Sequence, residues 1–441
     1  MSAVGIHTLI QSAFKLQKEG DLEGAESMYV QALALSPEQP DCLHMLGVLR
    51  LRRKQYLDGL DFIERACMAS GWQYASYSYN LVRAAAEVAS QCAAMTNNLC
   101  ERSNLVSLAR KQRARERQDD AMPLVSILMP SYNHERYVVA ALQSVFAQTY
   151  SNMEIIVIDD GSTDHSVQLI REELKRSPFP HRFIARQNQG ANATINECIN
   201  LANGRYVNAL NSDDLFSANR IERMVQEVHH GGAEWGFARC AILNEHGLAI
   251  DPRDRRYIGI QAHYRSIEDT SHISHFFLRA NPSVSTGNIF SSRKFMVDLG
   301  GFANYRYNHD WAFCLDASWR SEPVMVDAVL YHYRLHGSNT ISEAGNDAGH
   351  EALLILNAYC DKAERDLPEN PLALCMQHDP AGFWLARLLH TRLQSDAATR
   401  IRHCIAQIRA HYLTISSNVA ARAVPMVQKA EGSRARPPGA G

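Results

Sequence analysis

The 441-residue sequence has almost no net charge and no long apolar run. Its 45 Lys and Arg residues nearly balance 47 Asp and Glu residues, and the formal net charge of -2 argues against bulk electrostatic binding of nucleic acid. No uninterrupted apolar run approaches the ~20 residues of a membrane-spanning helix. No basic segment followed by an apolar one marks a secretory signal. We therefore expect a cytoplasmic location, with any membrane contact peripheral at the inner face.

Several short motifs of well-known chemistry are also missing. The ten cysteines are scattered, without a C-x-x-C pair or a zinc-type spacing, which predicts buried, reduced thiols. Neither G-x-G-x-x-G nor G-x-x-x-x-G-K-[ST] occurs, which counts against a dinucleotide site and a P-loop. No G-x-S-x-G elbow and no H-E-x-x-H pair is present, so the chemistry of serine hydrolases and zinc proteases is not indicated.

The first hundred residues contain a helical repeat. The stretch "KEGDLEGAESMYVQALALSP" (18–37) has small and aromatic residues at the offsets of a tetratricopeptide helix pair, whose period is about 34 residues. A second unit follows one period later, and a weaker third begins near Tyr77. Residues 6–95 therefore resemble the tetratricopeptide family, which implies an array that binds a protein partner or associates with itself. A helical cap without any partner is the alternative.

A basic stretch separates this region from the rest of the chain. The segment 96–122 contains "ARKQRARERQ", with five basic residues in ten. One interpretation is a solvated linker helix. The other is a weak contact with anionic lipid head groups, to which each Lys or Arg would contribute about 1 kcal/mol.

Beyond Pro123 the pattern changes to alternating strands and helices. Apolar segments such as "LVSILMP" and "EIIVIDD" are typical of strands buried on both faces. They alternate with amphipathic helical segments, which predicts an α/β domain with a doubly wound, mostly parallel sheet. The strands end in "PSYN", "DDGS", "NQG" and "NSDD". Because ligands bind at the carboxyl ends of such strands, we expect these polar groups to form a site.

The acidic strand ends favour a metal ion. Asp159 and Asp160 follow one strand, and Asp213 and Asp214 follow another. If the ligand of this site carries a diphosphate, the carboxylates at the strand ends would repel it. A Mg²⁺ or Mn²⁺ ion between the carboxylates and the diphosphate would be bound by oxygen atoms of both groups. The alternative is that one of Asp159 and Asp160 caps the helix that follows and the other is only solvated, and that the "SDD" stretch caps the helix that begins near Ser217.

Four motifs together resemble a family 2 glycosyltransferase of the A-type fold over residues 123–342. They are "VSILMPSYNHERYVVAALQSVFAQTYSNMEIIVIDDGSTDHS", "NQGANATINECINLANGRYVNALNSDD", "GGFANYRYNHDWAF" and "YRLHGSNT". The resemblance implies transfer of a sugar from a nucleoside-diphosphate donor. It implies Asp310 as catalytic base and a metal site at Asp213, with His336 near the metal or diphosphate. The donor-binding candidates are Pro130, Tyr132, Asp159, Asp160, Asn188 and Asn211, and the metal candidates are Asp213, Asp214 and His336.

The sequence departs from the family pattern at two positions. Asn211 stands where the first Asp of the D-x-D motif is often found, which leaves open whether Asp213 or Asp214 is the principal metal ligand. His309 replaces the Glu that commonly precedes the base. Because Asp310 itself is retained, we expect activity to be retained.

These patterns predict an inverting, metal-dependent glycosyltransferase that uses a nucleotide sugar, with UDP-sugars favoured. The expected acceptor is a hydroxyl of a saccharide, a lipid-linked molecule or a protein. The alternative is a non-catalytic tetratricopeptide scaffold with a degenerate sugar-nucleotide domain. We expect a mobile loop over 252–281, helices that pack on the α/β domain over 343–415, and a disordered tail over 416–441.

Overall fold

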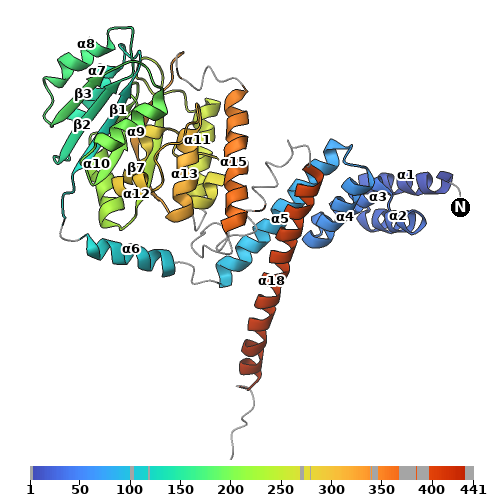
Figure 1. Ribbon diagram of the computed structural model, residues 1–441. Helices are drawn as coiled ribbons and strands as arrows, with labels where there is room; N and C mark the ends of the chain where they lie inside the picture. Colours follow the sequence, from blue (N-terminus) through green and yellow to red (C-terminus); the bar gives the residue numbers. More distant parts are fainter. Residues whose placement is uncertain are drawn as a thin grey trace, which may run out of the picture. The chain divides into compact units, whose positions relative to one another are not determined.

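The computed structural model describes residues 3–99, 104–117, 120–268, 273–278, 280–337, 339, 346–366, 384 and 397–432. The chain forms two compact units (Figure 1). A helical unit comprises Met1–Glu101 with Asp379–Gly441, and an α/β unit comprises Arg102–His378. No helix within the described ranges combines the length and the apolar character that crossing a bilayer requires.

The helical unit begins with five helices whose loops are short. They are α1 (Ala3–Glu19), α2 (Leu22–Leu35), α3 (Pro40–Arg52), α4 (Tyr56–Ala69) and α5 (Ala75–Leu99). The small residues of the repeat pattern let α3 and α4 approach closely, because a Cβ on Gly47 would lie 2.5 Å from Ile63 and 2.9 Å from the Gly59 carbonyl. Tyr29 is buried in the same core. This helical region agrees with the repeat pattern, and its membership of the tetratricopeptide family stays a prediction.

The C-terminal helices divide between the two units. Helix α15 (Asp347–Asp366) packs on α13 (His309–Arg320) in the α/β unit, as expected. Helix α18 (Ala397–Gly432) instead packs on α5, and Arg409 lies 2.9 Å from Glu64. The prediction for this helix was wrong because amphipathicity shows that a face is buried, but not against which partner. Residues 416–432 continue α18 where a disordered tail was expected. Of the helices expected over 343–415, the part at 367–396 lies outside the described residues except Trp384.

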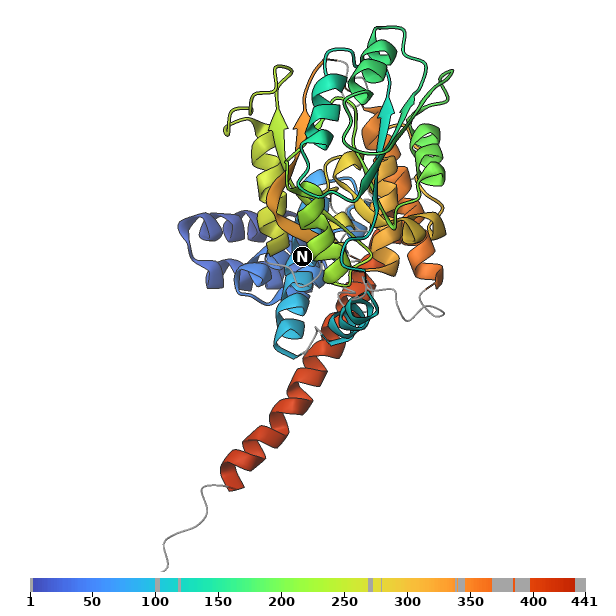
Figure 2. The ribbon, with the colours of Figure 1, turned by 90° about the vertical axis from the view of Figure 1, so that its left-hand side faces the viewer.

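The α/β unit is built on one eight-stranded sheet with helices on both faces (Figure 2). The strands are β1 (Val125–Ser131), β2 (Met153–Asp159), β3 (His181–Ala185), β4 (Tyr206–Ala209), β5 (Leu215–Phe216), β6 (Trp235–Leu243), β7 (Phe290–Ser292) and β8 (Val324–Arg334). Their order is β3-β2-β1-β4-β7-β6-β8-β5. The first four are parallel to one another, and β7 then pairs antiparallel with both β4 and β6. The predicted α/β fold is confirmed, with a mixed second half.

The helices between the strands follow the sequence pattern in the parallel half of the sheet. They are α7 (Val138–Phe146), α8 (Ser166–Leu174) and α9 (Ala191–Leu201). Shorter helices follow: α10 (Arg220–Met224), η1 (Val225–His230), η3 (Thr286–Asn288) and α12 (Arg293–Asp298). The register of β1 and β2 pairs Ser131 with Asp159. The two polar strand ends therefore lie side by side.

The segment 252–281 is not the loop that the sequence suggested. It contains helix α11 (Arg255–Glu268) and the 3-10 helix η2 (Ile273–Leu278). Tyr264 anchors α11, because its fully buried ring lies on the sheet and its hydroxyl accepts a 2.9 Å hydrogen bond from the Cys240 N–H. Tyr264 and Ile267 are the buried side chains of this helix. Two neighbouring positions near its end are buried in place of a continuous apolar stripe, which explains the weak periodicity of its sequence.

The basic linker is part of the α/β unit. It forms helix α6 (Asn104–Glu116), whose arginines bond to backbone carbonyl groups. Arg110 donates to the carbonyls of Glu322 and Pro323 at 3.0 and 2.9 Å. Arg117, directly after the helix, donates to the Ala233 carbonyl at 2.7 Å and to the Glu234 carboxylate at 3.1 Å. These arginines bind groups of the α/β unit. The expectation that the linker is solvated was therefore wrong for their side chains.

This docking can be tested by removing one buried guanidinium. We expect Arg117→Met to lower the free energy of unfolding by about 1–3 kcal/mol, because buried carbonyl groups lose their donor. The measurement is urea unfolding of the full chain followed by tryptophan fluorescence. Arg115→Met is the control, because Arg115 is exposed in the last turn of α6, two residues before Arg117. It should change the free energy of unfolding by less than about 0.5 kcal/mol. Equal midpoints for the two variants would contradict the docking role.

Candidate active site

The turn after β2 uses its first carboxylate for its own structure. Asp159 is fully buried, and its carboxylate accepts hydrogen bonds from the Ser162 N–H and hydroxyl at 2.8 and 2.7 Å. Gly161 has φ +85°, and a Cβ there would lie 2.8 Å from the Asn188 nitrogen. The turn thus requires glycine at this position. Asp159 holds the turn closed, whereas its neighbour Asp160 bonds to the turn after β3.

Asp160 is bound to the following strand end. Its carboxylate pairs with the Arg186 guanidinium and accepts 2.9 Å hydrogen bonds from the N–H groups of Gln189 and Gly190. Asn188 is exposed on the same turn. This arrangement leaves a carboxylate and a guanidinium side by side at the carboxyl edge of the sheet.

The loop after β1 lies against the turn after β2. Pro130 is half-buried near the end of β1, and Tyr132 is 47% exposed. Asn133 adopts a left-handed conformation with φ 54°. Its side chain accepts a 2.8 Å hydrogen bond from the Thr163 N–H, so it ties the two loops together.

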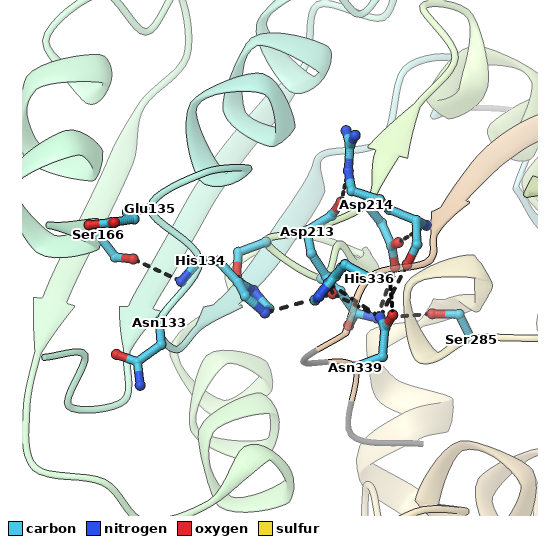
Figure 3. Close-up of polar contacts among 12 residues, drawn as sticks. Asn133, His134, Glu135, Ser166, Asp213, Asp214, Ser285, His336 and Asn339 are labelled. Carbon is cyan, nitrogen blue, oxygen red and sulfur yellow. Dashed lines mark hydrogen bonds and ion pairs between the residues drawn. The ribbon is translucent and has the colours of Figure 1, made fainter. Parts of the chain in front are cut away.

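The backbone and the ring of His134 are each held by one hydrogen bond, of which Figure 3 shows the backbone bond to Ser166. Its backbone N–H donates to the Ser166 hydroxyl at 2.9 Å, and its Nδ1 lies 2.7 Å from the Ser212 hydroxyl. The opposite ring nitrogen, Nε2, is 3.7 Å from Oδ2 of Asp213. The imidazole is therefore oriented with one free nitrogen toward a buried carboxylate.

Asp213 faces two imidazoles. His336, which follows β8, places Nε2 2.9 Å from the same Oδ2. One ligand atom from each of His134, Asp213 and His336 lies within 4.8 Å of the others (Figure 3). Burial opposes ionisation of Asp213, but the hydrogen bond with His336 and the nearby His134 hold its pKa below the usual range. Among the described residues this is the one cluster of three such groups that could hold a metal ion.

Asp214 lies outside that cluster because its oxygens are already bonded. Oδ2 accepts from the Tyr331 hydroxyl at 2.5 Å and from the Asn211 amide at 3.1 Å. Oδ1 accepts from the Arg334 N–H at 2.7 Å. Burial and the neighbouring Asp213 carboxylate raise the pKa of Asp214 well above the usual range. Asn211 is also turned away, since its amide nitrogen donates to Ser285 at 3.0 Å as well.

Asp310 is connected to this region through the loop before β7. Ser285 contacts Asn211, and the next residue, Thr286, lies 2.9 Å from the His309 ring through its hydroxyl. Val284, just before them, has φ 69°, an outlier for a β-branched residue. Such strain is concentrated at functional sites. The metal-side and base-side candidates are thus joined by one short loop.

The Asp310 carboxylate is buried in the first turn of α13. Oδ1 accepts a 2.7 Å hydrogen bond from the Trp311 N–H. Burial raises its pKa, and the favourable effects of His309, the Trp311 N–H and Asn281 offset this only in part. Asp310 could instead have served only as the N-cap of this helix, but that position belongs to Asn308.

Residues 126–281 match the sequence model described as glycosyl transferase family 2. The α/β unit contains a family 2 glycosyltransferase domain. An uncharacterized glycosyltransferase of Haemophilus influenzae is 38% identical over 104 residues, which are 24% of this chain and 42% of that protein. The chondroitin synthase of Escherichia coli is 35% identical over 106 residues, which are 24% of this chain and 15% of that protein. The chain therefore spans less than half the length of these curated relatives.

Among solved structures, the Staphylococcus aureus TarS fragment 1–349 with UDP-GlcNAc is similar. It shares 14% identity and a TM-score of 0.44, over 67% of this chain and 91% of that one.

Three groups of this region were not predicted from the sequence. His134 was overlooked because nothing in "PSYNHER" marks a metal ligand, and Arg186 because it follows an exposed edge strand. The loop at 284–286 carries no motif that sequence reasoning can recognise. A histidine or arginine at the carboxyl end of a predicted strand, opposite an acidic strand end, was the available signal.

The glycine turn next to Asp160 can be tested by a matched pair of substitutions. Gly161 and Gly190 have φ +85° and +94°, but only at Gly161 does an added Cβ meet a neighbouring atom. Both alanine variants should lose about 1–2 kcal/mol from the left-handed conformation. Gly161→Ala should lose a further ~1–3 kcal/mol from the clash. Chemical unfolding of both proteins measures the difference, and equal losses would contradict the close approach.

Proposed function

We propose that this chain is an inverting glycosyltransferase that moves a sugar from a nucleoside-diphosphate sugar to an acceptor hydroxyl. The acceptor is a saccharide, a lipid-linked molecule or a protein. The observation that carries the proposal is the buried Asp213 carboxylate facing His134 and His336, within a family 2 domain.

A divalent metal ion suits the residues at this position. Asp213, His134 and His336 would hold it, with one carboxylate oxygen and two imidazole nitrogens. When bound, such an ion stabilises the negative charge of a departing diphosphate. Mg²⁺ prefers oxygen ligands and retains its waters, whereas imidazole suits transition metals. The donor set therefore favours Mn²⁺ over Mg²⁺, and Asp213 rather than Asp214 is the principal carboxylate.

The donor nucleotide is assigned to the turns after β1, β2 and β3. Pro130 and Tyr132 would contact the nucleoside, and Asp160 with Arg186 would bind the edge of the base. A carboxylate oxygen beside a guanidinium offers an acceptor and donors in one plane, which complements the imide edge of uracil. UDP-sugars are favoured for this reason. Asp159 and Asn188 would support these turns. Asn211, in the turn after β4, would act on the donor site only through Asp214 and Ser285, to which its amide donates.

Asp310 is assigned as the base that takes the proton of the acceptor hydroxyl. Its carboxylate is buried, and burial raises its pKa, which improves a carboxylate as a proton acceptor. A single base, with no second nucleophile evident among the residues that the structure describes, supports direct displacement with inversion at the anomeric carbon. The helical unit would bind the acceptor, a second protein or another copy of the chain.

The metal assignment predicts a selectivity that direct binding can measure. In calorimetry with UDP present, Mn²⁺ should bind more tightly than Mg²⁺. His134→Gln should weaken Mn²⁺ binding by at least ~10-fold, since loss of a group that holds or orients a metal typically costs that much. Asp213→Ala should abolish metal-dependent nucleotide binding. His165→Gln, an exposed histidine on the neighbouring turn, is the matched control, and equal affinities in both histidine variants would refute the ligand role of His134.

The base assignment predicts the behaviour of Asp310→Asn. Turnover should fall by at least ~10²-fold with donor affinity unchanged, because a proton acceptor is lost. In the wild type, kcat/KM should fall as the pH drops through the raised pKa of Asp310, and the variant should lack this limb. Pre-steady-state and steady-state rates across pH test both expectations. Near-normal turnover in the variant would move the base elsewhere, with His309 and His336 as the next candidates.

The same substitution should not destabilise the protein. A carboxyl group whose folded-state pKa is raised stabilises the fold below its unfolded pKa and loses that contribution as the pH rises through the folded pKa. Asp310→Asn should therefore melt at or above the wild-type temperature near neutral pH, and the advantage should vanish in acid. A melting temperature well below the wild type at neutral pH would mean that the carboxylate is mainly structural.

A further inference from the structure

The loop that enters α13 is held by one carboxylate from α15. Glu351 accepts hydrogen bonds from three consecutive backbone N–H groups, those of Arg306, Tyr307 and Asn308, at 2.7, 2.8 and 2.8 Å. Its Oε2 also accepts from the Asn308 side-chain amide at 3.2 Å. One side chain thus receives four hydrogen bonds from a single turn.

Glu351 holds the turn that leads into α13, because its backbone hydrogen bonds come from the two residues before the N-cap and from the N-cap residue Asn308. Asn308 occupies the N-cap position without a side-chain capping bond, because its amide donates to the Ala348 carbonyl at 2.9 Å and to Glu351. A helix start presents unpaired N–H groups and a partial positive charge, which an anion stabilises. Burial opposes ionisation of Glu351, but the three N–H groups hold its pKa below the usual range. The Glu351 side chain is therefore an ionised carboxylate at neutral pH.

The anchored turn leads directly into the proposed base. Asp310 is the second residue of α13, two positions after Asn308. The turn is fixed on its other side as well, since the Tyr305 carbonyl accepts a 2.6 Å hydrogen bond from Asn192 on α9. Because the backbone on the N-terminal side of Asp310 is held at consecutive residues, little freedom remains for its carboxylate to shift.

Helix α15 has a second, separate tie to α13. Lys362 lies 2.9 Å from Asp316, and the rings of Tyr359 and Trp319 meet edge to face at 5.8 Å. These contacts lie more than one helical turn beyond Asp310. They attach α15 to the domain without touching the turn at 306–308, so the two functions of the helix can be separated by mutation.

We propose that Glu351 is the positioning residue for Asp310, and that the catalytic unit consequently extends through α15, well past residue 281 where the family match ends. This inference rests on the proposed function, in which Asp310 is the base. Glu351 does not touch the reacting atoms. It sets where the carboxylate of Asp310 stands relative to the acceptor hydroxyl.

Glu351→Gln tests this role because it keeps the size of the side chain and removes its charge. We expect kcat to fall by about 10- to 10²-fold, since a small displacement of a reacting group has that effect. The KM for the donor and the affinity for Mn²⁺ with UDP should stay within twofold of the wild type. Glu351→Asp keeps the charge but is shorter, so it should lower kcat less. It provides the test if the Gln variant does not fold.

Lys362→Met is the matched control. It removes the ion pair between Lys362 on α15 and Asp316 on α13. The kcat of this variant should equal that of the wild type even if its melting temperature falls. A loss of kcat in this control equal to that in Glu351→Gln would mean that general docking of α15 matters, which would overturn the specific role of Glu351.

Two further outcomes distinguish the positioning role of Glu351 from the assignment of Asp310 as the base. If Asp310→Asn is inactive while a folded Glu351→Gln keeps kcat within twofold of the wild type, the positioning role is wrong and the base assignment stands. If Asp310→Asn retains turnover, the base assignment fails and the positioning role fails with it. When both hold, Asp310→Asn with Glu351→Gln should be no slower than Asp310→Asn alone, because residues that act through one group are not additive.

Discussion

The rest of the site depends on the hydrogen bonds that the buried carboxylate of Asp214 accepts. It joins three segments that are distant in sequence: the loop after β4, the strand β8 through Tyr331 and the Arg334 N–H, and the Ser285 loop through Asn211. A buried carboxylate is costly unless its oxygens are hydrogen-bonded, and here both are. The hydrogen bonds between these segments are made by Asp214. Its neighbour Asp213 does not make them and faces His134 and His336.

The same device recurs around the site. Asp159 closes the turn after β2, Asp160 receives two backbone N–H groups of the turn after β3, and Glu351 receives three before α13. Loops carry many backbone donors that water cannot reach once the site is formed. Carboxylates satisfy several of them at once, so each fixes a loop as well as contributing charge. The acidic character of the site is therefore in large part structural.

The compact α/β unit, Arg102–His378, reaches beyond the residues 126–281 that match the family model. On the N-terminal side, α6 is bound to it through Arg110 and Arg117, which cap carbonyl groups at the ends of other elements. On the C-terminal side, α15 holds the turn before Asp310 through Glu351. Both helices act on backbone groups, which any sequence presents, so neither leaves a strong signature in the segments that it contacts.

The sequence by itself determined the α/β class, the strands that end in polar motifs and the family, because alternating periodicity and short motifs are local properties. It also identified Asp213 and His336, which the structure brings to 2.9 Å. Only the tertiary structure decided that Asp213 rather than Asp214 faces the imidazoles, that His134 lies beside Asp213 and His336, and that α18 packs on α5. Each of these depends on which groups from distant segments satisfy one another. A hydrogen bond used in one contact is unavailable for another, and that competition is settled only when the chain is folded.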